Sequence, residues 1–311
     1  MKIGFLFAGQ GAQYPGMGKS LYECSKAARK VFDDAGEEIK DRCFNGTKES
    51  LRQTQITQPC VYIVGMAAYS ALIESIDIEP VGVAGFSLGE YSALTAAKVI
   101  ENIDIGLKIV TRRGELMMKA GLGDDGAPIG GMTAALGKRE EILKYVDSAR
   151  EDGILSAVNF NSPSQTVVAG DKAALKRFGE KASGSKVKVI PLSVGTAFHT
   201  SMMRPAVEPL RQLLIEAELK KPALKIYCNL TGKEIEGSIA CVMAKQAESP
   251  VRWQETIENM AADGIEILIE IGPGKALSGM VRKTAPQITT MNVEDKESLE
   301  KTVETLRGKS T

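Results

Sequence analysis

The stretch Val81–Leu94, VGVAGFSLGEYSAL, decides the fold class of this 311-residue chain. Its apolar start, Val81–Ala84, predicts a short buried strand, and from Leu88 onward apolar side chains recur every three residues, as on one face of a helix. Between strand and helix the sequence is Gly-x-Ser-x-Gly, which in this context is typical of a nucleophile elbow centred on Ser87. The stretch therefore predicts an α/β fold in which a serine hydroxyl stands at a helix N-terminus.

Strand and helix patterns alternate on both sides of this stretch. The first apolar run, Lys2–Ala8, ends in a glycine-rich loop at Gly9–Gln13, as expected of a buried strand. Such alternation indicates an α/β fold with a mainly parallel sheet, here a large α/β-hydrolase-like domain. The sequence predicts further strands at Leu224–Tyr227 and Ile265–Ile271, and helices at Ser20–Ala35, Thr57–Ile76, Ile103–Lys119, Ser201–Ala217 and Trp253–Asp263.

A different order of elements follows a Gly- and Asp-rich linker at Gly121–Gly131. The order is strand, helix, strand, strand, helix, strand, which is the ferredoxin-like arrangement. We therefore expect a large catalytic domain from residues 1–124 and 196–311, with an inserted ferredoxin-like small subdomain at residues 125–195. The expected elements of the insertion are Met132–Leu136, Lys138–Ala149, Ile154–Phe160, Gln165–Ala169, Lys172–Ala182 and Val187–Leu192.

The composition of the chain excludes several classes of function. The chain has 39 basic and 39 acidic side chains and a net charge of zero, so a large nucleic-acid-binding field is not expected. It holds one histidine, His199. A single imidazole rules out zinc sites with several histidine ligands, 2-His-1-carboxylate iron sites and H-E-x-x-H peptidases, and we expect no metal.

Cysteine usage and hydropathy bear on location. The five cysteines are odd in number, widely spaced and form no C-x-x-C motif, which is typical of reduced thiols in the cytosol. The apolar run at the N-terminus is too short for the core of a signal peptide. The longest mainly apolar stretch, Val61–Ile73, is expected to be too short to span a bilayer. We therefore expect a cytoplasmic protein without membrane contact.

A serine nucleophile needs a base, and His199 is the available imidazole. His199 follows an expected strand and opens an expected helix. A lone histidine is ordinarily a surface or core residue, but its pairing with a serine elbow favours a Ser87–His199 dyad. At the start of the helix, the backbone N–H of Leu88 is placed to donate to an oxyanion.

Taken together, seven separated motifs resemble those of the malonyl-CoA:acyl carrier protein transacylase family. The resemblance covers nearly the whole chain, and seven motifs in the right order are far more specific than any one of them. The expected ferredoxin-like insertion is also similar to the small subdomain of that family. The motifs are Phe7–Gln13, Ser87–Leu94, Arg113-Gly114-x-x-Met117, Asn159–Pro163, Ala197–His199, Pro250–Trp253 and Glu270–Gly274.

The resemblance implies an acyltransferase, an acyl-carrier-protein S-malonyltransferase with ping-pong chemistry. It implies that Ser87 attacks the thioester of malonyl-CoA while His199 takes the proton. It also implies that backbone amides of Gln10 and Leu88 hold the oxyanion, and that Arg113 grips the malonyl carboxylate bidentately. The malonyl group then passes to the phosphopantetheine thiol of a holo acyl carrier protein, for fatty acid or polyketide synthesis. No cofactor is implied, because the partner carries the phosphopantetheine.

Further positions concern the imidazole and the choice of substrate. The resemblance implies that the backbone carbonyl of Arg252 orients the His199 ring in place of a carboxylate. Phe198 is similar to the residue of malonyl-selective members, and its ring would crowd an α-methyl group, so we expect a modest preference for malonyl over methylmalonyl. Asn159 and Asn161 either line the cleft of the small subdomain and bind substrate, or form a turn with Asn at positive φ.

Two other classes of function stay open at this stage. A serine thioesterase or acyl hydrolase would use the same elbow, although a hydrolase has no need of a carboxylate clamp at Arg113. A non-catalytic sensor of malonyl-CoA would have no need of both Ser87 and His199. As partners we expect malonyl-CoA and an acyl carrier protein, with no nucleic acid, and we expect a monomer.

Overall fold

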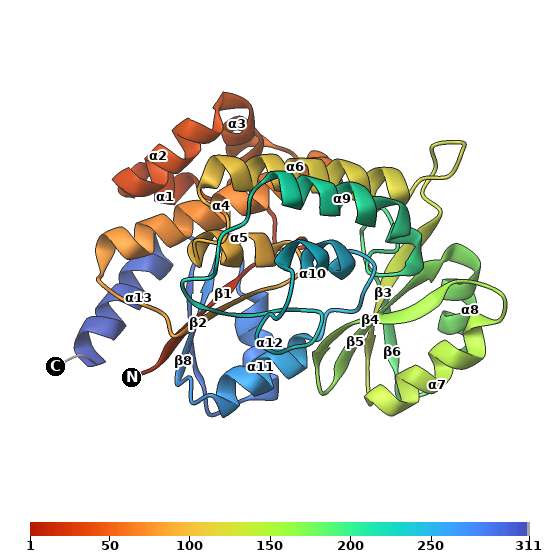
Figure 1. Cartoon of the computed structure of the whole chain (residues 1–311). Helices are drawn as coiled ribbons and strands as arrows, with labels where there is room; N and C mark the ends of the chain where they lie inside the picture. The colour runs from red at the N-terminus through yellow and green to blue at the C-terminus, as the bar shows by residue number, and fades with distance from the viewer. Residues whose placement is uncertain (310–311) are drawn as a thin grey trace.

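The computed structural model describes residues 1–309 and contains two sheets, in two units of the chain (Figure 1). The larger sheet has five parallel strands in the order β7-β2-β1-β8-β9, which confirms the predicted α/β class with a mainly parallel sheet. Ser310 and Thr311 of the expected catalytic domain lie outside the described residues. The strands are β1 (Ile3–Phe7), β2 (Gly82–Gly85), β7 (Lys225–Tyr227), β8 (Ile267–Ile271) and β9 (Thr289–Val293).

Two of the expected helices of the large unit differ from the prediction, and the structure adds helices that were not expected, at Glu37–Asn45, Ile239–Gln246, Ala276–Thr284 and Lys296–Lys309. The expected helix Ser20–Ala35 is two helices, because Ser25 is extended and its Oγ accepts a hydrogen bond from the backbone N–H of Ala28 (3.0 Å), which caps the second helix. The expected helix Ser201–Ala217 begins as a 3-10 turn at Ser201–Met203. The helices are α1 (Lys19–Cys24), α2 (Lys26–Ala35), α3 (Glu37–Asn45), α4 (Thr54–Ser75), α5 (Gly89–Ala96), α6 (Ile103–Ala120), α9 (Arg204–Glu216), α10 (Ile239–Gln246), α11 (Trp253–Ala262), α12 (Ala276–Thr284) and α13 (Lys296–Lys309).

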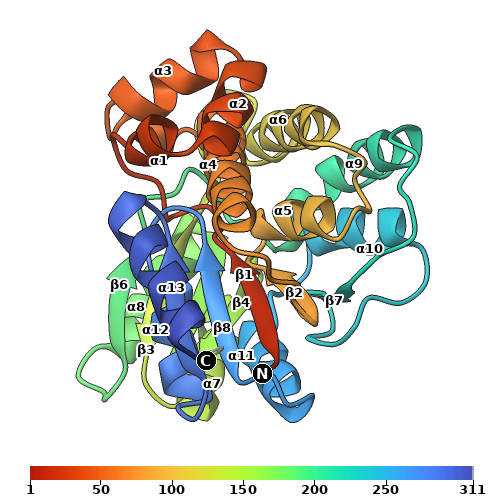
Figure 2. The same ribbon diagram turned by 90° about the vertical axis from the view of Figure 1, so that its left-hand side faces the viewer.

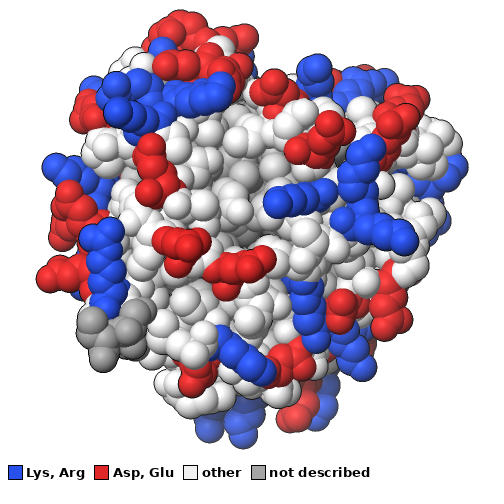
Figure 3. All heavy atoms as spheres, turned by 60° about the vertical axis from the view of Figure 1, so that its left-hand side comes forward, with Lys and Arg blue, Asp and Glu red and all other residues white. Residues whose placement is uncertain are grey.

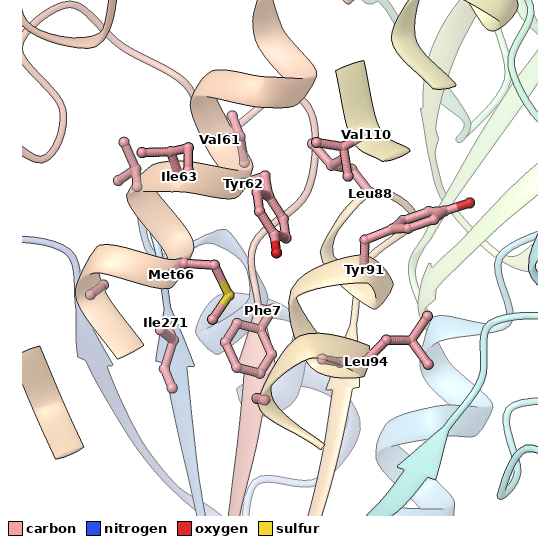
Figure 4. Packing of buried hydrophobic residues seen from close by; sticks show 14 of the residues in the cluster. Phe7, Val61, Tyr62, Ile63, Met66, Leu88, Tyr91, Leu94, Val110 and Ile271 are labelled. Carbon is pink, nitrogen blue, oxygen red and sulfur yellow. The ribbon is translucent and has the colours of Figure 1, made fainter. Parts of the chain in front are cut away.

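Side chains of the large sheet alternate between two layers of helices. In β1, Phe5 and Phe7 belong to the buried cluster that includes α4 and α5, whereas Leu6 belongs to the cluster that includes α11 and α12. Figure 2 shows these two layers on opposite sides of the sheet. In the close view, Phe7 and Ile271 of the sheet lie beside Met66 of α4 (Figure 4). Burial on both faces is the reason that these strands read as nearly continuous apolar runs.

The small unit has a four-stranded sheet in the order β4-β5-β3-β6, with antiparallel neighbours throughout. Its elements follow in the order strand, helix, strand, strand, helix, strand, so the predicted ferredoxin-like arrangement is confirmed. Residues of both helices pack on one face of this sheet, with Phe178 fully buried among them. The elements are β3 (Gly130–Leu136), α7 (Arg139–Arg150), β4 (Leu155–Ser162), β5 (Gln165–Asp171), α8 (Lys172–Ala182) and β6 (Lys188–Pro191).

A short backbone bridge joins the two units. Val251 of the large unit donates its N–H to the carbonyl of Val158 (2.7 Å) and accepts the N–H of Phe160 (2.9 Å) on β4. This pairing fixes β4 beside the segment that follows α10. The small sheet is thereby held at one end of the large sheet, as Figure 1 shows.

Helix α4 is apolar over a longer stretch than the sequence analysis considered. Within the described residues, α4 is long and apolar enough to cross a membrane, whereas the expectation concerned only its central part, Val61–Ile73. However, 78% of its most apolar window is buried inside the protein. Its side chains fill the space between the large sheet and α2 and α6, as expected of a core helix that is apolar all round.

Charges of both signs are spread over the surface. Figure 3 shows Lys and Arg side chains interspersed with Asp and Glu on one face, with uncharged areas between them. This distribution fits the net charge of zero. On this face no extended field of one sign is present that would favour a polyanion.

Candidate active site

Ser87 stands in a strained turn between β2 and α5. Its φ is 51°, a left-handed conformation that a residue with a side chain rarely adopts. The flanking glycines are sterically required, because a Cβ at Gly85 would overlap the backbone of Gly89, and one at Gly89 would overlap the carbonyl of Phe7. The turn therefore has the geometry that the Gly-x-Ser-x-Gly pattern predicts.

The structure brings Ser87 and His199 into direct contact. Ser87 Oγ lies 2.8 Å from His199 Nε2, although the two residues are 112 positions apart. The other ring nitrogen, Nδ1, lies 2.9 Å from the carbonyl oxygen of Gln246 and 3.0 Å from that of Ser249. Two carbonyl acceptors fix the proton on Nδ1, so that Nε2 is free to accept the serine proton.

The predicted role of Arg252 is wrong. The carbonyl of Arg252 accepts hydrogen bonds from the N–H and the hydroxyl of Thr256, because Arg252 immediately precedes α11. Its side chain is exposed and pairs with Glu255 (3.0 Å). The carbonyls that reach the imidazole come from the end of α10 and the turn that follows it. The Arg252 guanidinium therefore places no charge beside the dyad.

Burial sets the protonation state of the imidazole. His199 is buried, and burial lowers its pKa to about 4, with the positive charge of Arg113 acting in the same direction. Its two carbonyl partners oppose this shift. The ring is therefore neutral at pH 7, which is the form that accepts a proton from Ser87.

Arg113 lies beside the nucleophile in an almost fully buried position. One of its terminal nitrogens lies 3.3 Å from Ser87 Oγ and 3.0 Å from Oε1 of Gln246, and the other lies 2.9 Å from Oε1 of Gln58. The guanidinium also lies over the ring of Tyr91, 5.2 Å from its centroid. Within residues 1–309 no carboxylate forms an ion pair with it. A buried cation with neutral partners is available to an incoming carboxylate.

The two predicted oxyanion donors flank the same space. Leu88 follows Ser87 at the start of α5, and Gln10 lies in the loop that follows β1. In the described part of the chain, neither backbone N–H donates to another protein group. Free N–H groups on both sides of a nucleophile can stabilise a tetrahedral intermediate.

A cavity of about 370 Å³ opens on Ser87, between the two units. Ser87, Arg113 and His199 line it, together with Gln10 and Phe198. From the small unit, Met132 and Asn159 contribute, so both units shape the space in which substrate would lie. Phe86 lines the wall and packs edge-on against Trp253, 5.3 Å between ring centroids.

The two asparagines of the candidate cleft differ. Asn159 lines the cavity and its Oδ1 has no hydrogen-bond partner among the described residues, whereas Asn161 is buried and lies outside the cavity lining. The expectation that both line the cleft was therefore wrong for Asn161. A register shift in β4 between Phe160 and Ser162 breaks the alternation that would put the two on one face. The alternative of a turn at positive φ was also wrong, since both residues belong to the strand.

Sequence analysis missed four polar residues that surround the site. Gln58 and Gln246 accept hydrogen bonds from Arg113. Asn229 accepts a hydrogen bond from the backbone N–H of Ser87 (2.7 Å), and Glu90 is buried behind the elbow. Of these four residues, Glu90 is the one that lies inside a motif of the sequence analysis, Ser87–Leu94. The other three come from distant segments, and no local pattern marks them.

The chain was compared with known proteins. The acyl transferase domain family matches residues 4–306. The malonyl CoA-acyl carrier protein transacylase of Bacillus subtilis is 38% identical over 316 residues, which is 98% of each chain.

The comparison with solved structures points to the same family. A malonyl CoA-acyl carrier protein transacylase from Clostridium perfringens superposes with a TM-score of 0.93 at 36% identity, over 100% of this chain and 98% of that one. A malonyl-transacylase in complex with a type II PKS acyl-carrier protein superposes with a TM-score of 0.91 at 32% identity, over 98% and 100% of the chains. The similarity extends over the whole fold, including both units.

Proposed function

This chain belongs to the acyl transferase domain family of malonyl-CoA:acyl carrier protein transacylases, and on that premise we propose how its site transfers a malonyl group. The protein takes the malonyl group from malonyl-CoA and gives it to the phosphopantetheine thiol of an acyl carrier protein, for fatty acid or polyketide synthesis. A solved relative bound to an acyl-carrier protein supports this partner. The cytoplasmic location and the monomeric state stay predictions from the sequence.

The first half-reaction forms a malonyl-serine. Ser87 Oγ attacks the thioester carbonyl while its proton passes to Nε2 of His199, which is neutral and 2.8 Å away. The N–H groups of Gln10 and Leu88 stabilise the oxyanion. When the tetrahedral intermediate collapses, the carbon–sulfur bond breaks and the imidazolium gives its proton to the departing thiolate of CoA.

The second half-reaction repeats these steps with a different thiol. The thiol of the carrier's phosphopantetheine gives its proton to His199 and attacks the malonyl-serine carbonyl. The serine–acyl bond then breaks, and Ser87 recovers its proton from the imidazolium. One imidazole serves both half-reactions, because each of them moves one proton between the serine oxygen and a thiol sulfur through the same ring nitrogen.

The position of Arg113 is the observation that supports malonyl as the transferred group. Its guanidinium lies 3.3 Å from the Oγ that will bear the acyl group, and its protein partners are neutral oxygens. The free carboxylate of a malonyl ester lies two carbons from that oxygen, which is within reach of the guanidinium. A hydrolase of neutral esters would leave this buried charge without a partner, which costs stability.

Intact-protein mass spectrometry after mixing with malonyl-CoA tests the proposal. We expect one added malonyl group on Ser87 that disappears when holo acyl carrier protein is added, with malonyl recovered on the carrier. Ser87→Ala should take up no label, whereas Ser92→Ala on the same helix should behave as the wild type. Rapid release of malonate to water at the rate of transfer would favour a hydrolase, and tight binding without labelling would favour a sensor.

A further inference from the structure

Glu90 is a buried carboxylate directly behind the nucleophile elbow. It lies in the first turn of α5, and its exposed fraction is 1%. Its Oε1 accepts the backbone N–H of Asn229 (2.9 Å), and its Oε2 accepts the side-chain amide of Gln246 (2.6 Å). It does not line the cavity. A fully buried carboxylate that meets no substrate needs a structural reason for being there.

Asn229, the first residue that donates to this carboxylate, also holds the elbow. Asn229 accepts the backbone N–H of Ser87 on its Oδ1 (2.7 Å) and donates from Nδ2 to the carbonyl of Gly85 (2.7 Å). These two bonds brace the turn in which Ser87 is held at positive φ. Glu90 fixes the backbone of Asn229, so the brace depends on the carboxylate.

Gln246, the second residue that donates to this carboxylate, connects it to the rest of the site. Nε2 of Gln246 donates both to Glu90 and to the carbonyl of Ser87 (2.8 Å). Its Oε1 accepts from Arg113 (3.0 Å), and its backbone carbonyl accepts from Nδ1 of His199 (2.9 Å). A single residue thus contacts the nucleophile's backbone, the base and the cationic clamp.

We propose that Glu90 is a positioning residue that aligns Ser87, His199 and Arg113 through Asn229 and Gln246. The proposal rests on the function proposed above. Glu90 acts through its neighbours and touches neither substrate nor the reacting atoms. Its two oxygens set the orientation of the Gln246 amide and the position of the Asn229 backbone together, from opposite sides of the elbow.

The chemistry of the contacts explains why a carboxylate is needed. Both partners of Glu90 are donors, and a carboxylate accepts at both oxygens, whereas a glutamine would turn an N–H₂ group toward one donor. Without an acceptor at Oε2, the Gln246 amide can rotate and point its N–H₂ at the Arg113 guanidinium. That rotation would remove one neutral partner of Arg113 and one bond to the Ser87 carbonyl.

The test compares Glu90→Gln with a matched control, Glu270→Gln. Glu270 is also a buried carboxylate with two donors, the N–H groups of Leu277 and Ser278 in the first turn of α12, but it lies in β8, outside the cavity lining. Assays at pH 8.5 keep Glu90 ionised, since burial raises its pKa to about 7. We expect Glu90→Gln to lower kcat for malonyl transfer about 10- to 100-fold, and Glu270→Gln to leave it within about twofold.

The single histidine of this chain gives a second readout that does not depend on activity. The imidazole Hε1 resonance belongs to His199 alone, and its Nδ1 bonds to the Gln246 carbonyl. We expect Glu90→Gln and Glu90→Asp to shift this resonance and its titration, and Glu270→Gln to leave both unchanged. Glu90→Asp keeps the charge but is shorter by one methylene, so it provides the same test if Glu90→Gln does not fold.

A double-mutant cycle tests whether Glu90 acts through Gln246. If it does, Glu90→Gln should cost clearly less in a Gln246→Ala background than in the wild type. The proposal would be overturned if the losses of kcat in the two single variants multiply in the double variant and the His199 resonance is unchanged in Glu90→Gln. Absence of malonyl-Ser87 in the wild type would overturn the proposed function instead, so the two failures are distinguishable.

Discussion

Replacement of Arg113 by alanine tests which part of the site selects malonyl. Arg113 is 1% exposed, and its nitrogens contact Ser87 Oγ, Gln58 and Gln246. In Arg113→Ala the malonyl carboxylate would enter a buried site without a cation. An acetyl group, which carries no carboxylate, would lose little there.

The magnitude follows from the burial of this charge. Removal of one partner of a buried ion pair costs about 3–5 kcal/mol, which corresponds to a factor of roughly 10² to 5 × 10³ in kcat/KM. The 3.3 Å contact with Ser87 Oγ affects malonyl and acetyl transfer alike, so it cancels when the two are compared. The ratio of kcat/KM for malonyl-CoA to that for acetyl-CoA should therefore fall by at least about 10².

The assay measures acylation of the enzyme from each thioester in a stopped-flow or quench experiment. Arg112→Ala is the matched control, because Arg112 is the neighbouring residue, is exposed, and pairs with Glu115 (2.7 Å) away from the site. We expect this variant to retain the wild-type ratio, and Arg113→Lys to be intermediate, because an ammonium cannot bond bidentately. Equal losses with both substrates, or unchanged malonyl kinetics, would refute the assignment of the clamp.

Three other predictions concern the dyad, the pocket and stability. The imidazole Hε1 resonance of His199 should titrate near pH 4, because burial lowers the pKa of His199, and a titration near pH 6.5 would contradict a buried neutral base. Phe198→Ala should improve methylmalonyl relative to malonyl transfer by about 1–3 kcal/mol, measured by competition, and an unchanged ratio would remove Phe198 from substrate choice. His199 binds its proton more weakly in the folded protein than in the unfolded chain. Its contribution to the free energy of unfolding should therefore fall as pH drops from about 6.5 to 4. Urea titrations would check this against a folded His199→Gln variant, which should lack that part of the slope.

Local chemistry made the nucleophile and its base predictable. The Gly-x-Ser-x-Gly pattern fixes a turn by steric necessity at Gly85 and Gly89, so neighbours in sequence determine the conformation of Ser87. A chain with one imidazole leaves no choice of histidine. The strand and helix alternation also reflects local periodicity, and for that reason the order of elements in the small unit was correct.

Predictions failed where tertiary packing determines which of several nearby residues reaches the site. The carbonyls that orient His199 belong to Gln246 and Ser249, because the chain turns after α10 and directs them at the ring, while the carbonyl of Arg252 is taken by α11. Asn161 lies outside the cavity lining because β4 shifts register between Phe160 and Ser162. The edge strand β9 and the helices α3, α10, α12 and α13 were missed, and of these β9 is half-exposed with no continuous apolar run.

The sequence by itself determined the fold class, the serine elbow and the histidine, since each depends on residue type and short spacing. The cation that complements a carboxylate was implied by the family resemblance. Only the tertiary structure decided how these groups are held. Glu90, Asn229 and Gln246 come from segments far apart in the chain, and their hydrogen bonds exist because α5, the segment after β7 and α10 converge behind Ser87. Such convergence is a property of packing, in which side-chain direction and backbone position are settled by all elements together.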